Sequence, residues 1–298
     1  MKTLPFLPLL LRRTGPPNAW LSSALLRATA LELVVLAGHA LIYPTGITGE
    51  RRTPPRPAAE PVPAPPGTTA LPGAHAGSAG HIGHPDRPPV VLLHGFIDNR
   101  SVFVLLRRSL ARHGWRHLES LNYSPLTCDI RTAAELLGRH VEEICSRTGH
   151  RRVDIVGHSL GGLIARYYVQ RLGGDQRVRT LVTLGTPHAG TAVAPLASAL
   201  PIVRQMRSGS APIEELRLPA PGCRTRFISF WSELDQLIVP AEAACVDHPD
   251  LDATNVRVSG IGHLALPVHP AVAAGVRQAL DAQEPENRTS VEHRAKAV

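Results

Sequence analysis

From residue 89 to residue 284, short apolar runs alternate with longer segments in which apolar positions recur every three or four residues. The short runs predict buried β-strands, and the longer segments predict amphipathic α-helices. The expected strands are residues 90–93, 117–123, 153–156, 180–184, 227–231 and 256–258. The expected helices are residues 101–112, 130–146, 161–172 and 270–280, and Asp129 is the expected N-cap of the second.

The alternation of strands and helices determines the expected fold class. Strands that recur with a helix between them pair in parallel through right-handed crossovers, so that helices cover both faces of one sheet. We therefore expect residues 89–284 to form an α/β domain with a doubly wound, mostly parallel sheet. Open sheets of this kind place their chemistry at the carboxyl ends of the strands. The residues that follow each strand are therefore the first candidates for a functional site.

The residues ahead of this domain follow a different pattern. Residues 1–49 form an apolar segment with basic residues near its start, and residues 20–43 within it are long enough to span a membrane. A charge near the centre of a spanning helix costs ~2.5–3.5 kcal/mol, which roughly cancels the gain from the aliphatic side chains here. The residues that interrupt the apolar stretch are Arg27, Glu32 and His39. Three interpretations stay open: a membrane anchor, an export signal, or a helix buried against the domain or a partner, and the order of basic before apolar residues favours the first two.

Two further segments are predicted to lie outside the folded domain. Residues 50–88 are rich in Pro, Gly and Ala, lack apolar bulk and contain many residues without a backbone donor, so we expect an extended, disordered linker. Its three histidines are better explained by a solvated linker than by a metal-binding tract. Residues 285–298 form a polar C-terminal tail.

One serine stands where a nucleophile would be expected. Ser159 lies in the run Gly-His-Ser-Leu-Gly-Gly, directly after one expected strand and directly before the next expected helix. A serine at such a turn needs small neighbours, because the backbone bends sharply and nearby chains approach closely. The strand-turn-helix setting favours a nucleophile over a serine that only caps a helix.

Three motifs, which follow one another along the chain in the expected order, together resemble the bacterial lipases and carboxylesterases of the α/β-hydrolase superfamily. They are the serine motif at residues 157–162, His-Gly-Phe at residues 94–96, and Leu-Gly-Thr-Pro-His-Ala-Gly-Thr at residues 184–191. The resemblance covers about residues 88–282 and leaves out the N-terminal part. It implies a compact α/β-hydrolase fold with a short insertion, and it is more specific for fold and nucleophile than for substrate.

A serine hydroxyl needs a base within hydrogen-bond reach and an acid that orients the base. In this fold the partners follow in the order serine, acid, histidine. Asp235 follows the expected strand at residues 227–231 and precedes Leu-Ile-Val-Pro, as in related hydrolases, and His263 follows the last expected strand. His269 is the alternative base. The competing acids are Glu233, Asp247, Asp250 and Asp252.

The resemblance also implies an oxyanion hole. Its donors would be the backbone N–H groups of Phe96, in the loop after the first strand, and of Leu160, at the start of the nucleophile helix. His158 is expected to be a packing or hydrogen-bonding neighbour rather than a second base. The insertion at residues 191–221 could form a small lid or a wall of the acyl site, or a plain surface loop with short helices.

Charge and cysteine content narrow the function classes. The chain has a formal charge of +8 and a sequence pI of about 10.0, but the basic residues are nearly all Arg and are scattered among acids. This distribution indicates a solvated surface and no nucleic-acid partner. There is no CxxC or His/Cys cluster, so no metal site is expected. Of the four cysteines, Cys128 and Cys145 flank a helix that would separate them, whereas Cys223 and Cys245 are the better candidates for a disulfide.

The leading hypothesis is a serine hydrolase that cleaves carboxylic esters with an apolar acyl part, lipids among them, through an acyl-Ser159 intermediate. No metal or organic cofactor is implied. Thioester hydrolysis or acyl transfer would use the same triad, and an inactive binding module on the hydrolase scaffold is the alternative from another class. The expected partners are an ester substrate and, through the N-terminal segment, a membrane. The expected location is membrane-associated or exported, and a cytoplasmic location stays open.

Overall fold

The computed structural model describes residues 23–46, 87–96, 98–123, 129–193 and 200–282. The expected C-terminal tail, nearly all of the expected linker, and Cys128 lie outside the described residues. The division of the chain into four segments therefore stays a prediction at these places.

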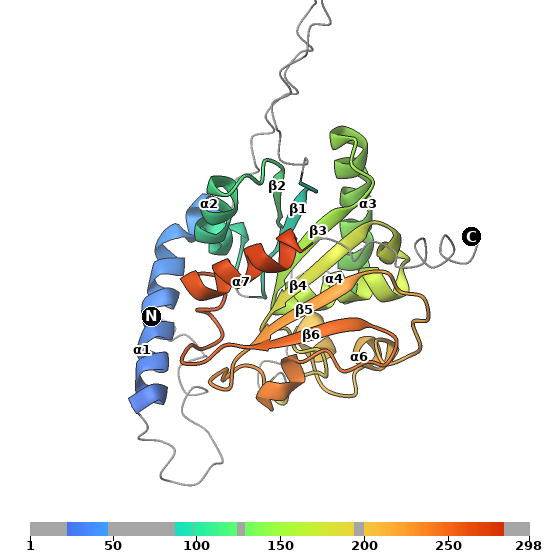
Figure 1. The fold of residues 1–298 in the computed structure, drawn as a ribbon. Coiled ribbons are helices and arrows are strands. Elements are labelled where there is room, and N and C mark those ends of the chain that lie inside the picture. Colours follow the sequence, from blue (N-terminus) through green and yellow to red (C-terminus); the bar gives the residue numbers. More distant parts are fainter. Residues whose placement is uncertain (1–22, 47–86, 97, 124–128, 194–199, 283–298) are drawn as a thin grey trace, which may run out of the picture.

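A six-stranded sheet forms the centre of the domain, with all neighbouring strands parallel (Figure 1). The strands lie in the order β2-β1-β3-β4-β5-β6, so the chain leaves the sheet centre in both directions from β1. This confirms the predicted α/β fold with a doubly wound parallel sheet. The strands are β1 (Val90–Leu93), β2 (Leu118–Leu121), β3 (Val153–His158), β4 (Val178–Leu184), β5 (Arg226–Trp231) and β6 (Asp252–Arg257).

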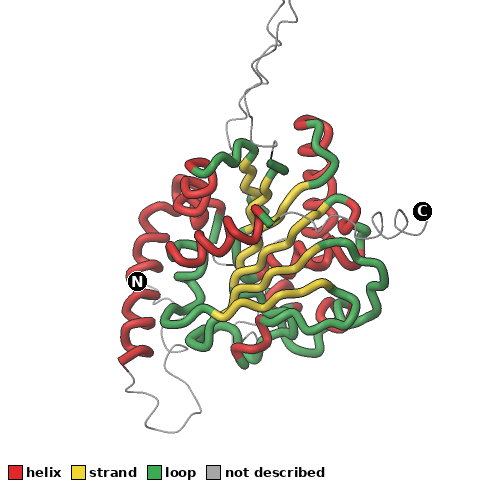
Figure 2. Tube along the Cα trace, viewed as in Figure 1, coloured by secondary structure: helices red, strands yellow, loops and turns green. Residues whose placement is uncertain are grey.

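Helices cover both faces of the sheet (Figure 2). On one face pack α3 (Ile130–Thr148) and α4 (Leu160–Arg171), and on the other α2 (Val104–Arg112) and α7 (Pro270–Asp281). The N-terminal helix α1 (Ser23–Ile42) lies outside α2 and α7. The shorter helices are η3 (Tyr43–Gly46), η4 (Arg100–Phe103), η5 (Gly174–Gln176), α5 (Pro201–Gln205), α6 (Ala211–Glu215) and η7 (Ala241–Ala244).

The two faces of the sheet divide the core in a way that follows from strand geometry. Successive side chains of a strand point to opposite faces, so in β1 Val91 and Leu93 pack with α3 and α4, whereas Val90 and Leu92 pack with α2 and α7. All four are buried because both faces are covered. This explains why the strand reads as a continuous apolar run rather than as an alternating one.

The observed elements differ from the expected ones mainly at the sheet edge. β6 begins at Asp252 and ends at Arg257, whereas the apolar pattern predicted a strand at residues 256–258. Its side chains are exposed or half-buried, since β6 pairs only with β5. An edge strand has no apolar requirement on its open side, so its first residues carry no strand signal.

The predicted cap is confirmed: the Asp129 carboxylate accepts the Thr132 backbone N–H at 2.8 Å.

The predicted pairing of Cys223 with Cys245 is wrong, because both are free thiols, as is Cys145. Cys223 precedes the start of β5, whereas Cys245 follows Ala244, whose carbonyl accepts the Ser229 hydroxyl near the middle of β5. The start of β5 and Ser229 are several residues of extended chain apart, at ~3.3 Å per residue. Cys223 and Cys245 therefore lie too far apart for a disulfide.

The insertion after β4 contributes α5 and α6. Ile202, Val203 and Ile213 are fully or almost fully buried in the cluster that also contains α3 and α4. The described part of the insertion is therefore packed firmly on the domain.

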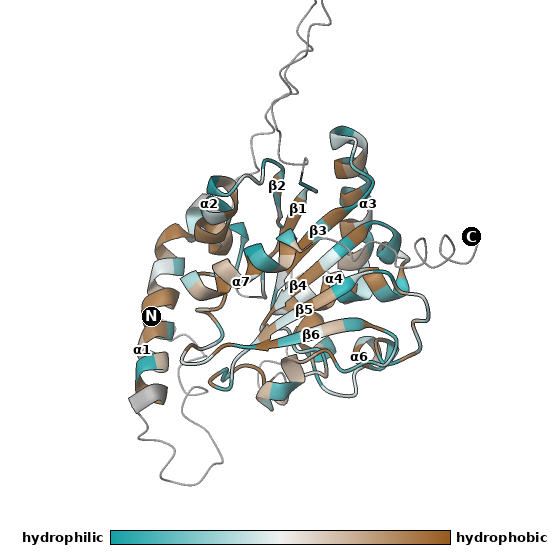
Figure 3. Ribbon diagram, viewed as in Figure 1, coloured by the Kyte–Doolittle hydropathy of each residue, from teal (hydrophilic) through white to brown (hydrophobic). Residues whose placement is uncertain are grey.

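Helix α1 carries its polar and apolar residues in an unusual arrangement (Figure 3). Its buried and half-buried side includes Ala28, Glu32, Val35 and His39, which recur every three to four residues. Its exposed side is apolar apart from Arg27. The exposed apolar residues are Leu26, Ala30, Leu33, Val34, Leu36, Ala37, Ala40 and Leu41. Of the three residues that interrupt the apolar stretch, Glu32 and His39 thus face the domain, whereas Arg27 is exposed.

Candidate active site

Ser159 occupies a sharp turn between β3 and α4. Its backbone has φ 52° and ψ −119°, and it is the non-glycine residue with positive φ among those described. Such a conformation is strained and persists only where the surroundings enforce it. Here the Ser159 N–H donates to the Leu184 carbonyl at 2.9 Å, and the Ser159 carbonyl accepts the Thr186 hydroxyl at 3.0 Å. The end of β4 therefore holds the turn in place.

Two glycines after the serine allow the close approach that this turn needs. A Cβ atom on Gly161 would collide with the carbonyl oxygens of Leu93 and His94, at the end of β1. A Cβ atom on Gly162 would collide with the Thr186 side chain, which holds the Ser159 carbonyl. The start of α4 thus packs directly on the end of β1 and on the segment after β4, and any larger residue would push Ser159 away from them.

Asp235 and His263 form a buried hydrogen-bonded pair. His263 Nδ1 donates to Asp235 Oδ2 at 2.7 Å, and both side chains are almost completely buried. The other oxygen, Oδ1, accepts the backbone N–H groups of Leu237 and Ile238 at 2.9 Å each. The carboxylate is therefore fixed by its own loop and in turn fixes the imidazole tautomer, which leaves His263 Nε2 to accept a proton.

The charges around His263 favour its protonated form. Burial alone lowers the pKa of a histidine, but the negative charge and hydrogen bond of Asp235 outweigh it, and Glu32 and Asp98 add to the effect. The net result is a pKa for His263 above the ordinary histidine value. A base that holds a proton more tightly takes it more readily from a hydroxyl.

The serine turn and the buried pair meet at the carboxyl ends of β3 and β4. Leu184, which accepts the Ser159 N–H, is followed by Gly185, where a Cβ atom would lie 3.0 Å from His263 Nδ1 and 3.1 Å from Asp235 Oδ2. The ring centroids of His158 and His263 are 4.8 Å apart. In the described part of the chain no hydrogen bond joins the Ser159 and His263 side chains, and catalytic contacts of this kind often tighten only when substrate binds.

The residues expected to form the oxyanion hole border the same turn. Leu160 is the first residue of α4 and is fully buried. Phe96 follows Gly95, where a Cβ atom would lie 3.3 Å from the Ser159 Cβ. Both segments that carry the expected donors therefore lie beside Ser159. His269, the alternative base, instead caps α7, where its Nδ1 accepts the Ala271 N–H at 3.3 Å.

The sequence did not reveal a second buried pair next to the site. His158 Nδ1 contacts Asp98 Oδ2 at 3.2 Å, and His158 Nε2 contacts the His263 carbonyl at 3.3 Å. Burial raises the pKa of Asp98, but the imidazoles of His158 and His39 outweigh it and hold that pKa well below its usual range. Burial lowers the pKa of His158. In the sequence, Asp98 could have been noticed because it is a carboxylate that closely follows the expected strand at residues 90–93.

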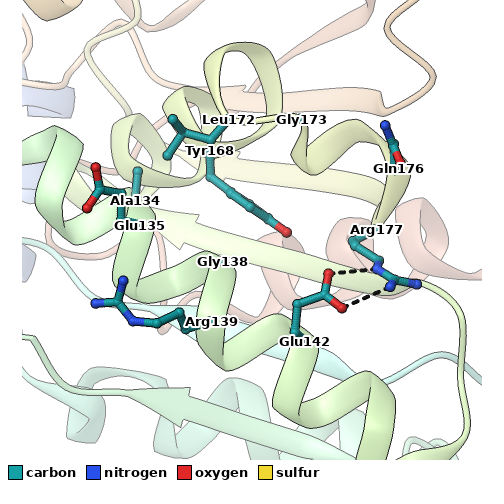
Figure 4. A pocket seen from close by; sticks show the side chains of 10 residues that line it. All are labelled: Ala134, Glu135, Gly138, Arg139, Glu142, Tyr168, Leu172, Gly173, Gln176 and Arg177. Atoms are coloured by element: carbon teal, nitrogen blue, oxygen red, sulfur yellow. Dashed lines mark hydrogen bonds and ion pairs between the residues drawn. The ribbon is translucent and has the colours of Figure 1, made fainter.

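Two other observations concern alternative sites. In the ranges that the structure describes, no group of three or more His, Cys, Asp or Glu residues could hold a metal ion. A surface hollow lies between α3 and α4, where Glu142 binds the Arg177 guanidinium through both of its oxygens (Figure 4). Arg177 immediately precedes β4, so this hollow lies toward the amino ends of the strands and away from Ser159.

Comparison with known proteins identifies the family. The family model described as palmitoyl protein thioesterase matches residues 89–242, just over half of the chain. The chain belongs to this family. The match includes Ser159 and Asp235 and ends ahead of His263.

More distant relatives agree with this assignment. The chain is 30% identical over 112 residues to a triacylglycerol lipase from Pseudarthrobacter phenanthrenivorans and to another from Burkholderia plantarii. These matches cover 35% of this chain and 34% and 31% of the two lipases, so they span only about a third of each relative.

Solved structures show the same fold. The mature form of Bacillus licheniformis lipase BlEst2 has a TM-score of 0.56 at 17% identity, covering 66% of this chain and 93% of that one. Aspergillus fumigatus lipase B has a TM-score of 0.60 at 16% identity, covering 70% and 56%. Together with the family match and the two lipase relatives, this fold makes the chain a lipase/esterase-like α/β-hydrolase, which confirms the resemblance noted in the sequence.

Proposed function

We propose that this protein hydrolyses carboxylic esters with an apolar acyl part through a covalent acyl-Ser159 intermediate. The observation that supports this most directly is the buried His263–Asp235 pair at the strand ends where the strained Ser159 turn lies. Family membership and the two lipase relatives agree with such a substrate class. No step of the proposed reaction needs a metal or an organic cofactor.

In the proposed reaction, Ser159 Oγ attacks the ester carbonyl carbon and its proton passes to His263 Nε2. The carbonyl oxygen becomes an oxyanion, which the backbone N–H groups of Phe96 and Leu160 would stabilise. His263 then gives its proton to the leaving alkoxide, which departs as an alcohol. Water attacks the acyl-enzyme and gives a proton to His263. His263 then passes this proton to Ser159 Oγ as the bond between the acyl carbon and Oγ breaks, so the carboxylic acid leaves and the Ser159 hydroxyl is restored.

The test is ester turnover by the full-length protein and by Ser159→Ala. Chromogenic esters of increasing chain length serve as substrates, and Ser208→Ala, at an exposed position, is the matched control. We expect Ser159→Ala to lower kcat by about 10⁶-fold, the scale of triad knockouts, and Ser208→Ala to match the wild type. Turnover that survives Ser159→Ala would contradict the mechanism, and equal inactivity of wild type and variant would favour a binding module.

A thioester substrate is the second candidate, because the matching family is described as palmitoyl protein thioesterase. The same nucleophile and base would serve, and only the leaving group would change from an alcohol to a thiol. An oxyester and a thioester with the same acyl chain, assayed side by side, separate the two. A kcat/KM that favours the thioester would assign the protein to thioester hydrolysis.

We further propose that α1 binds a membrane surface without crossing the bilayer. Its residues 25–42 are long and apolar enough to span, yet one side of the helix is bonded to the domain through Glu32 and other polar residues. A spanning helix would have to give up these partners and bury the charge in hydrocarbon. A helix that lies in the interface plane keeps them and places its exposed apolar side among the lipid chains. The protein would then work at the membrane surface.

A further inference from the structure

Glu32, in α1, contacts the loop that carries the proposed base. Its Oε2 accepts the Leu264 N–H at 2.9 Å, and its Oε1 accepts the Ala265 N–H at 3.0 Å. These are the two peptide groups directly after His263. We propose that Glu32 is a positioning residue for His263, so that α1 is part of the catalytic apparatus rather than only an anchor. This inference rests on the function proposed above.

The geometry of the two hydrogen bonds explains how such a residue would act. A carboxylate that accepts two successive N–H groups, one on each oxygen, fixes two peptide planes at once. The loop needs this support because Gly260 and Gly262 precede His263, and glycines leave a backbone free to take other conformations. The Asp235 bond orients the ring, whereas the Glu32 bonds would fix the backbone from which the ring projects.

Gly262 provides independent support for the contact. A Cβ atom on Gly262 would lie 2.6 Å from the Glu32 Cδ and 2.7 Å from its Cγ. The missing side chain before the base therefore creates the space that the Glu32 carboxylate occupies. The loop and the helix fit each other at this residue, although they are far apart in sequence.

The rest of the α1 interface is directed at the same site. The Gln236 amide, one residue after Asp235, donates to the Thr29 hydroxyl at 3.3 Å. His39 Nδ1 lies 3.4 Å from the Asp98 carboxylate, which also contacts His158. Helix α1 thus contacts the segments of the proposed acid and the proposed base, and it contacts Asp98, the partner of the residue before the nucleophile. This distribution is what a helix that stabilises the site would show.

Glu32 would also act on His263 through its charge. The groups that face His263 are Asp235, Asp98, His158 and Glu32, and the three carboxylates all raise the pKa of His263. Removal of the Glu32 charge would lower that pKa, because a negative neighbour favours the protonated imidazole. Activity that requires neutral His263 would then persist to a lower pH. A residue with only a structural role in α1 would not produce this shift.

The experiment uses the full-length protein, Glu32→Gln, Glu32→Ala and the matched control Glu142→Gln, which removes an exposed carboxylate on the far side of the sheet. A fluorophosphonate that labels active serines counts functional sites, so that kcat is expressed per site. We expect both Glu32 variants to lower kcat by about 10-fold or more, since small displacements of a catalytic group have large effects. KM should change little. In Glu32→Gln the acid limb of kcat/KM should move down by about half a pH unit or more.

Gly262→Ala supplies a second variant that keeps the Glu32 charge but displaces its carboxylate. We expect it to lower kcat per labelled site as well. Wild-type values of kcat and of the acid limb in Glu32→Gln would overturn the inference, and so would a lower kcat with an unmoved acid limb. A wild-type protein that neither reacts with the fluorophosphonate nor cleaves any ester would instead overturn the proposed function itself.

Discussion

His263 combines two opposing influences at the scale of a single residue. Its complete burial disfavours the charged imidazolium, whereas Asp235, Glu32 and Asp98 surround it with negative charge. The charges outweigh burial, and the pKa rises. The neighbouring His158 has the opposite balance, because burial dominates and its pKa falls. The same buried cluster therefore shifts the pKa values of two adjacent imidazoles in opposite directions, upward for His263 and downward for His158.

The raised pKa of His263 predicts the pH dependence of the reaction. The base must be neutral in the free enzyme, and its raised pKa means that protonation begins at a higher pH than for an ordinary histidine. We therefore expect kcat/KM to fall as the pH is lowered through a midpoint above about 6.5. Measurement of kcat/KM from pH 5 to pH 9 with a soluble short-chain ester checks this. Asp235→Asn should lower kcat by about 10⁴-fold, and a wild-type midpoint at or below the ordinary histidine value would contradict the assignment.

The sequence alone supported only part of this residue-level picture. Ser159, Asp235 and His263 follow from local motifs and from the order in which the partners occur, and their roles stay predictions until they are tested. The contacts of Asp98 with His158 and of Glu32 with the His263 loop could not be derived in this way. They join segments that are 60 and 232 residues apart, and no local periodicity encodes which side chains meet after folding.

At the scale of elements, one buried ion pair joins three parts of the fold. Asp154 in β3 is fully buried and accepts two hydrogen bonds from the Arg179 guanidinium in β4, at 2.9 and 2.6 Å. The same guanidinium donates to the Leu280 carbonyl of α7 at 2.7 Å. The apolar pattern located all three elements, but it gave no reason for a carboxylate inside a strand whose residues are all buried. The partner explains it, because a charge is tolerated in a core only when it is paired.

Removal of one member of this pair should therefore destabilise the domain. Asp154→Ala leaves the Arg179 charge without its carboxylate between β4 and α7, and we expect a loss of about 3–5 kcal/mol in the free energy of unfolding. The control is Glu142→Ala, which breaks the exposed pair with Arg177 and should cost less than about 1 kcal/mol. Urea unfolding followed by circular dichroism measures both. Equal losses in the two variants would show that the buried pair contributes no more than a surface one.

At the scale of the whole molecule, the packing of α1 on the domain explains why polar residues interrupt this apolar helix. In the sequence, Glu32 and His39 are costs that count against an apolar helix in a bilayer. In the structure both face the domain, and the side that they leave exposed is apolar apart from Arg27. The sequence could not show this, because it does not reveal which side of α1 the domain covers. The interpretations of an anchor and of a helix packed on the domain are therefore compatible: one helix can serve both through opposite sides.

This arrangement predicts how the protein partitions between water and lipid. Leu33, Val34 and Leu41 are 49%, 68% and 81% exposed on the outer side of α1, where water disfavours them. Each should contribute about 1 kcal/mol or more when it enters lipid. The triple substitution to Gln should therefore reduce binding to liposomes about 100-fold, and Leu218→Gln, an exposed leucine remote from α1, should not. Flotation with phospholipid vesicles measures binding, and ester turnover without vesicles should be retained, because these side chains do not contact the site.

Helices that lie in the interface are extracted by alkaline carbonate, whereas spanning helices are not. Wild-type protein that stays in the membrane after that wash would show that α1 spans the bilayer, and the hydrogen bonds of Glu32 would then have to break when it inserts.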